Sequence, residues 1–96
     1  MKRAMMINAS DNVVVMAEAA VKGDEIYYEN GSKKIVFTAA TDIPVYHKAA
    51  IKDIAKGERA TKYGCTIGVA MTDIPKGAHV HVHNIESDMS ADMKGR

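Results

Sequence analysis

The chain has 96 residues and nearly balanced charge, with 13 basic and 12 acidic side chains giving a formal net charge of +1. This length predicts one small domain, and the lack of a basic block argues against a surface that follows nucleic-acid phosphates. A single cysteine, Cys65, excludes an internal disulfide framework and a zinc site built from several thiolates. No apolar run is long enough for a membrane span or a signal peptide, so a soluble cytoplasmic protein is expected.

Two segments near the N-terminus predict β-strands. Residues 12–20 and 33–40 are rich in the β-branched side chains that strands favour. The pair Asn30-Gly31 lies between them and is typical of a hairpin turn. Residues 47–58 can be read as a short helix, but their Asp-Ile and Lys-Gly pairs favour a strand followed by a turn.

Two further strands are expected in the C-terminal half. Residues 60–71 predict a strand with a bend or bulge, because two glycines interrupt it, and residues 78–86 predict the last strand. The expected fold class is therefore all-β, made of short strands and tight hairpins with little helix. Residues 1–86 are expected to form the domain, and residues 87–96 a polar C-terminal tail.

A short phrase recurs along the chain, in which apolar or small residues are followed by Lys-Gly. This pattern predicts a strand, a tight turn and a further strand, because glycine adopts the positive φ that such turns require. A fourth, altered copy places Tyr46 where Gly77 stands, so either that turn has another shape or Tyr46 is there to present its ring. The intact copies are residues 17–25, 51–59 and 71–79, and the altered copy is residues 41–50.

The run "HVHVHN" at residues 79–84 places three histidines at every second position. In a strand, His79, His81 and His83 would share one face, with successive members roughly 6.5–7 Å apart. Neighbouring rings could then converge on one metal ion or one anionic ligand. The alternative is a half-exposed strand that simply turns its polar residues outward.

The second half of the chain contains four motifs in a fixed order. They are His-Lys-x-Ala, Asp-Ile-x-x-Gly-Glu, Lys-Tyr-Gly-x-x-Ile-Gly and Asp-Ile-x-x-Gly-x-His-Val-His-x-His-Asn. With these motifs, residues 42–87 resemble the SAF-type domain of the altronate/galactarate dehydratase family, which includes the sulfolactate sulfo-lyases. The resemblance implies a compact β-clip fold. This domain either precedes a large catalytic domain or forms a separate small subunit, and a chain that ends soon after the histidines is expected to be the small subunit.

The resemblance also implies a lyase activity that this chain completes only with a large catalytic subunit. The family eliminates water from a sugar acid, or sulfite from sulfolactate, and depends on iron or manganese, which we expect the large subunit mainly to hold. The isolated chain is expected to be inactive. Tyr46 departs from the glycine that the family has before His-Lys. The implied catalytic residues are His81 and His83, the substrate-binding residues are His47, Lys48, Lys62, Tyr63 and Asn84, and the possible metal ligands are His79, His81 and His83.

Three functions stay open from the sequence. The first is the small subunit of a heteromeric hydro-lyase of the altronate dehydratase type. The second is the small subunit of a (2R)-sulfolactate sulfo-lyase. The third is a non-catalytic regulatory module that binds a sugar acid or a metal ion. No nucleic-acid or membrane partner is expected, and the isolated chain could form a homo-oligomer.

Overall fold

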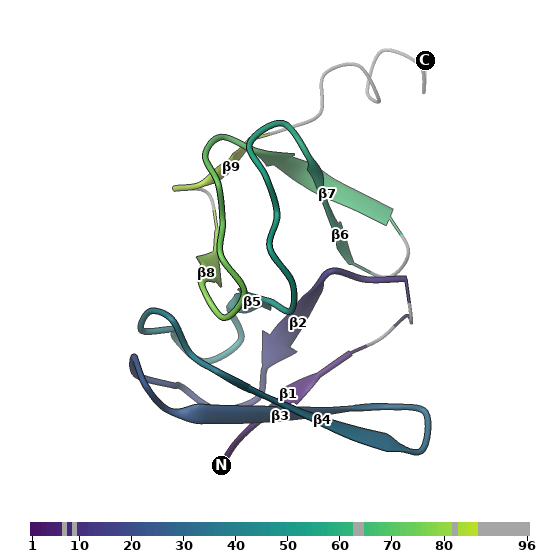
Figure 1. The fold of residues 1–96 in the computed structure, drawn as a ribbon, viewed down its shortest axis with the longest axis vertical. Coiled ribbons are helices and arrows are strands. Elements are labelled where there is room, and N and C mark those ends of the chain that lie inside the picture. Colours follow the sequence, from purple (N-terminus) through teal and green to yellow (C-terminus); the bar gives the residue numbers. More distant parts are fainter. Residues whose placement is uncertain (7, 9, 63–64, 82, 87–96) are drawn as a thin grey trace.

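The computed structural model describes residues 1–6, 8, 10–62, 65–81 and 83–86, and the backbone alone of residues 62, 65 and 66. These residues form two β-sheets and no helix, so the predicted all-β class is confirmed. The larger sheet has the strand order β4-β3-β1-β2-β5-β8, and the smaller one has the order β6-β7-β9 (Figure 1). The strands are β1 (Lys2–Met5), β2 (Val13–Met16), β3 (Glu25–Asn30), β4 (Lys33–Thr38), β5 (Lys48–Ala50), β6 (Arg59–Lys62), β7 (Cys65–Ala70), β8 (His79–Val80) and β9 (Ile85–Glu86).

Short antiparallel pairings dominate this arrangement, as a β-clip of tight hairpins requires. The predicted hairpin turn joins β3 to β4, where Asn30 pairs with Lys33 and Gly31 has a φ of 64°. The alternative helix over residues 47–58 is not formed, because β5 pairs with β2 and β8 there. In the described part of the chain there is no helix that could cross a membrane.

Two apolar clusters fill the interior, and β2 and β5 lie between them. Neighbouring residues of a strand point to opposite faces. Val13 and Ala50 therefore pack in one cluster, whereas Val14 and Ala49 pack in the other, and each of these side chains is at most 1% exposed. Packing on both faces fixes the position of β5, the strand that the motif His-Lys-x-Ala enters.

The four copies of the repeated phrase form four similar turns, each followed by a strand. The predicted turn and following strand are confirmed, whereas the strand expected before each turn is only a single bridge residue. In each copy one residue makes an isolated bridge to another copy, Ala20 with Ile43 and Ile54 with Ile74. A two-residue turn follows, and then a strand begins. The third residue after each bridge residue has a positive φ, which is 95° at Gly23, 67° at Tyr46, 90° at Gly57 and 88° at Gly77.

Aspartate side chains hold these turns in pairs. In three copies, the aspartate before the bridge residue accepts a hydrogen bond from a lysine backbone N–H in the paired turn. Such bonds satisfy turn amides that no strand partner reaches. In the remaining copy the equivalent residue is Ala19, which has no carboxylate. The two turns joined by the Ala20–Ile43 bridge therefore share one such bond, and the two joined by the Ile54–Ile74 bridge share two. The bonds join Lys22 to Asp42 at 2.8 Å, Lys56 to Asp73 at 2.9 Å and Lys76 to Asp53 at 2.9 Å.

Tyr46 adopts the same backbone conformation as the glycines of the other turns. Its φ is 67°, and its backbone N–H donates a hydrogen bond to the Met16 carbonyl oxygen at 2.8 Å. A positive φ costs a residue with a β-carbon about 1 kcal/mol. The side chain is 73% exposed. The altered copy therefore keeps the shape of the turn and presents the tyrosine ring to solvent.

The expectation of one strand over residues 60–71 is wrong. The segment is an antiparallel hairpin of β6 and β7, and residues 63–64 lie outside the described part. The predicted bulge does occur, because the register shifts next to Gly68. A β-carbon on Gly68 would lie 2.8 Å from the backbone oxygen of Glu86 in β9, so this close strand approach requires glycine.

The expectation of one continuous strand over residues 78–86 is also wrong. β8 ends at Val80 in the larger sheet, and β9 begins at Ile85 in the smaller one. The chain turns between them, and of this connection the structure describes residues 81, 83 and 84. The three histidines of the motif therefore do not lie along one strand. The expected C-terminal tail, residues 87–96, lies outside the described residues.

Candidate functional site

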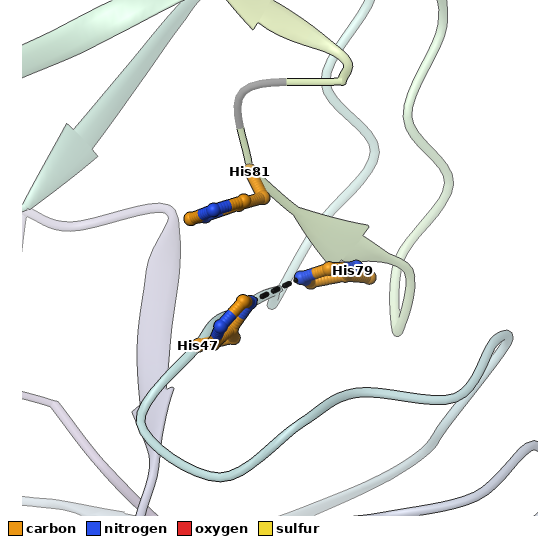
Figure 2. Close-up of side chains that lie close together, drawn as sticks. All are labelled: His47, His79 and His81. Carbon is orange, nitrogen blue, oxygen red and sulfur yellow. Dashed lines mark hydrogen bonds between the residues drawn. The ribbon is translucent and has the colours of Figure 1, made fainter.

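The four histidines of the chain gather where β5 meets β8, and we call this group the histidine cluster. His47 directly precedes β5, His79 begins β8, and His81 and His83 follow β8. Figure 2 shows the rings of His47, His79 and His81 projecting toward one another from these two places. The ring centroids lie 5.0 Å apart for His47 and His79, 4.3 Å for His47 and His81, 5.7 Å for His79 and His81, and 4.9 Å for His79 and His83.

Asn84 shapes the turn that brings the motif histidines together. Its Oδ1 accepts a hydrogen bond from the His81 backbone N–H at 3.0 Å, and its Nδ2 donates one to the His79 carbonyl oxygen at 2.7 Å. Its backbone N–H also donates to the His81 carbonyl oxygen at 3.0 Å. The side chain is buried, at 7% exposed. Asn84 therefore fixes the backbone from which His79 and His81 project.

The turn places the rings closer than a regular strand would. In a strand, His79 and His83 would be about 13 Å apart, but their ring centroids are 4.9 Å apart. The prediction that the three rings share one side of the molecule is met by this compact turn, although its basis, an extended strand, is wrong.

His47 belongs to a separate motif, His-Lys-x-Ala, and the resemblance placed it at the substrate site but did not predict its contact with His79. It lies 32 residues before His79, yet its Nδ1 is 2.8 Å from Nε2 of His79, and one of these nitrogens donates a hydrogen bond to the other. The contact arises because β5 pairs with β8, with Ala49 opposite His79. The repeat offers a signal for it, since His47 and Ala78 hold equivalent places just before these two strands.

The cluster lowers the pKa of two of its own rings. Partial burial and the positive charges that His83, His47, His81 and Lys48 can carry lower the pKa of His79 from 6.5 to about 4. Partial burial also lowers the pKa of His81, together with the charges of His47, Lys48 and His83. Both rings are therefore neutral at pH 7, and each keeps a nitrogen lone pair.

We expect the ring of His79 to stay neutral down to about pH 4, which an NMR titration of the isolated chain in a chelator can measure. Because the folded-state pKa lies below the ordinary 6.5, the unfolded chain binds the proton first as the pH falls. The free energy of unfolding should therefore decline between about pH 6.5 and pH 4, by about 1–2 kcal/mol for a partly exposed ring. His79→Gln should reduce this decline and leave the part that the lowered pKa of His81 contributes. A His79 pKa near 6.5 would contradict the expectation.

Of the other predicted site residues, Lys48 and Asn84 lie near the cluster, whereas the side chains of Lys62 and Tyr63 are outside the described part of the chain. Lys48 begins β5, and its charge acts on both His79 and His81. Lys62 ends β6 in the smaller sheet, where only its backbone is described, and Tyr63 lies outside the described residues. The amide of Asn84 already bonds to backbone groups on both sides, so its contact with a substrate stays a prediction.

Three rings of the cluster could hold a metal ion. His47, His79 and His81 each offer one ring nitrogen, and these nitrogens lie within 4.8 Å of one another. The set expected from the sequence had His83 in place of His47. The described side chains thus provide a group of three imidazoles, in which His47 comes from a different part of the chain than His79 and His81.

An open cavity of about 700 Å³ lies beside the cluster. His79 and His83 line it together with Thr41, Asp42 and Lys22. Thr41 also accepts a hydrogen bond at its Oγ1 from the His79 backbone N–H at 2.9 Å, which links the cavity wall to β8. The volume is in the range of pockets that hold small molecules, so there is room for a ligand next to the rings.

The described residues thus form an all-β domain with tight paired turns and a histidine cluster beside a cavity. Residues 2–88 match the altronate/galactarate dehydratase SAF domain. The chain belongs to this family, and the resemblance seen in the sequence is confirmed.

Similar proteins include two altronate dehydratases and one subunit of a sulfo-lyase. The chain is 40% identical to altronate dehydratase of Escherichia coli (strain K12) over 88% of its own length and 16% of that protein. It is 33% identical to altronate dehydratase of Bacillus subtilis (strain 168) over 94% of its length and 17% of that protein. It is 35% identical to (2R)-sulfolactate sulfo-lyase subunit alpha of Chromohalobacter salexigens, over 83% of its length and 88% of that subunit. The chain thus spans about one sixth of the length of these dehydratases.

Proposed function

We propose that this chain is the small subunit of a heteromeric hydro-lyase of the altronate dehydratase type. The gathering of all four histidines beside an open cavity carries the proposal, because it occurs in a domain that belongs to the dehydratase SAF family. The proposed reaction removes water from a sugar acid by β-elimination. A large catalytic subunit, which is the proposed partner, completes the site.

Such an elimination needs a base, an acid and a positive group in a fixed arrangement. The base removes the proton next to the carboxylate, and the acid protonates the departing hydroxide. We assign these proton transfers to His81 and His83. The lowered pKa of His81 leaves its ring neutral and able to accept a proton at pH 7, and His83 is exposed toward the cavity.

Lys48 is the proposed contact for the substrate carboxylate. Its ammonium group is near enough to lower the pKa of both His79 and His81, so a carboxylate bound there would lie beside the proton-transfer groups. A positive charge at that point also stabilises the negative charge that develops on the substrate. The further proposed substrate contacts are His47, Lys62, Tyr63 and Asn84.

The second subunit is needed because the cluster supplies only part of the machinery. The charged groups that lower the pKa of His79 and of His81 are imidazoles and one ammonium group, and no carboxylate is among them. In the complete enzyme, iron or manganese would stabilise the charge on the substrate. We propose that the large subunit mainly holds that ion, whereas this chain supplies proton transfer and binds the carboxylate.

A second candidate is the small subunit of a (2R)-sulfolactate sulfo-lyase. The match to subunit alpha of that enzyme covers 88% of the subunit, which favours a subunit role with sulfite as the leaving group. The same base and the same carboxylate contact serve both reactions, because both remove a proton next to a carboxylate. The two candidates differ in the leaving group and therefore in the substrate.

We expect the pure isolated chain to show no turnover of altronate or (2R)-sulfolactate. Turnover should appear when the polypeptide that co-purifies with it from its native host is added back. An assay of both substrates, with and without that polypeptide, makes the measurement. Altronate turnover by the pair supports the first candidate, and sulfolactate turnover supports the second. Turnover by the partner-free chain, or none by the pair, would overturn the proposed division of labour.

A further inference from the structure

We propose that His47, His79 and His81 form a binding site for a divalent first-row transition-metal ion within this chain alone. The proposal goes beyond the lyase function, because it requires neither a large subunit nor a substrate. It differs from the expected row of His79, His81 and His83 by one ligand. That difference makes it testable residue by residue.

The geometry is close to that of a three-imidazole site. One nitrogen from each of the three rings lies within 4.8 Å of the other two, and the pair from His47 and His79 is 2.8 Å apart. A tetrahedral ion with bonds of about 2.0–2.1 Å holds its ligand nitrogens roughly 3.3 Å apart. The nitrogens of His47 and His79 already face each other, as the dashed line in Figure 2 shows. The ring of His81 lies beside them, 4.3 Å from that of His47 at 32° and nearly parallel to that of His79 at 10°, so it must turn for its lone pair to meet the same ion.

The backbone around two of the ligands is already ordered. The Asn84 side chain bonds to the backbone of both His79 and His81, and the buried strand β5 begins directly after His47. Ordering the ligands before the metal arrives lowers the entropy cost of binding. Fixed supports of this kind are typical of metal sites, where groups behind the ligands hold their orientation.

The electrostatic environment favours ligation over protonation. The pKa of His79 is lowered to about 4 and that of His81 is also lowered, so protons compete weakly for their lone pairs at neutral pH. An anion, by contrast, would need charged rings. Lys48 opposes a cation at the same place, but it is suited to bind an anionic ligand that completes the coordination.

The donor set selects the class of metal ion. Imidazole nitrogens suit Zn²⁺, Co²⁺, Ni²⁺, Cu²⁺ and Fe²⁺, whereas Mg²⁺ and Ca²⁺ prefer oxygen ligands. Three protein ligands leave at least one coordination position open.

The test is metal binding by the tag-free full chain at pH 7.5, measured by calorimetry with Zn²⁺ and by the visible absorption of Co²⁺. We expect one ion per chain, and no comparable binding of Mg²⁺. His47→Ala, His79→Ala and His81→Ala should each weaken Zn²⁺ binding by at least about tenfold. His83→Ala is the matched control and should change the affinity less than about threefold.

Two results would overturn the proposed metal site. If the wild-type chain binds Zn²⁺ no better than the His79→Ala variant, the metal site does not exist. If His83→Ala abolishes binding and His47→Ala does not, the ligands are those of the motif and the proposal is wrong. Circular dichroism of each variant, with His79→Gln as a second substitution, separates ligand loss from unfolding. Because no enzyme activity is read, a lyase assay that fails leaves this result unaffected.

Discussion

Replacing His81 with alanine is expected to lower turnover by the assembled enzyme at least about 100-fold, which is the usual contribution of a general acid or base. The ring is only partly buried, and it contacts other histidines rather than the apolar clusters. Its removal should therefore leave the domain folded, with less than about 1 kcal/mol lost from the free energy of unfolding. Steady-state kinetics of the reconstituted pair and chemical denaturation of the isolated chain measure the two quantities.

His83→Ala is expected to cause a similar loss of turnover, although it spares metal binding by the isolated chain. His83→Ala should thus lose turnover alone, whereas His81→Ala should lose both turnover and metal binding. Lys33→Ala, on the distant β3–β4 hairpin, is a control that should keep full activity. A loss of more than about 2 kcal/mol of stability in His81→Ala would indicate a structural role instead, and full activity would remove His81 from the mechanism.

Gly77→Ala is expected to destabilise the domain by about 3 kcal/mol or more, the largest effect that we expect on folding. Gly77 has a φ of 88°, and a β-carbon there would lie 2.1 Å from the Thr38 carbonyl oxygen and 3.0 Å from the Ala40 nitrogen. Both contacts are with backbone atoms, which cannot rotate away. Because small domains have only about 5–15 kcal/mol of stability, urea denaturation should show a markedly lower midpoint.

Gly57→Ala is the matched control for this prediction. Gly57 has nearly the same φ, 90°, but a β-carbon there would meet no atom within 4 Å. Its replacement should cost only about 1 kcal/mol, from backbone strain alone. Tyr46 shows that an open turn of this kind accepts a side chain. Equal losses in the two variants would mean that the close approach to Thr38 does not matter.

Much of the fold could be predicted because the turns carry strong local signals. Lys-Gly at Gly23, Gly57 and Gly77 marks places where the backbone needs a positive φ, and few other residues adopt it cheaply. Asn30-Gly31 marked the hairpin in the same way. The repeat also located a fourth copy at Tyr46, where the glycine is missing, but it left open whether that turn keeps the same shape.

The boundaries of the last strands could not be predicted, because alternation of apolar and polar residues is not confined to strands. Val80 is buried and His79 and His81 are not, which matches a strand, yet the chain turns after Val80. The Asn84 side chain decides this by bonding to the backbone three and five residues earlier. Such a local hydrogen bond competes with the hydrogen bonds between strands, and it produces no periodic pattern in the sequence.

The site was predicted in part for a related reason. The motif named His79, His81 and His83, because they are close in sequence. His47 joins them only through the pairing of β5 with β8, and a pairing of two short strands has no signature in either strand alone. The long separation between His47 and His79 therefore hid their direct contact, although the resemblance had placed His47 at the same site.

The contact between His47 and His79 crosses the seam between β5 and the edge strand β8, which has two residues. So short an edge has few backbone bonds of its own, and local opening would begin there more easily than in the buried centre. A ligand that joins both rings resists this opening, so its binding energy adds to the local stability. Hydrogen exchange of the β8 backbone amides should therefore slow when a ligand binds the histidine cluster. The exchange rate of these amides then measures whether the cluster holds a ligand.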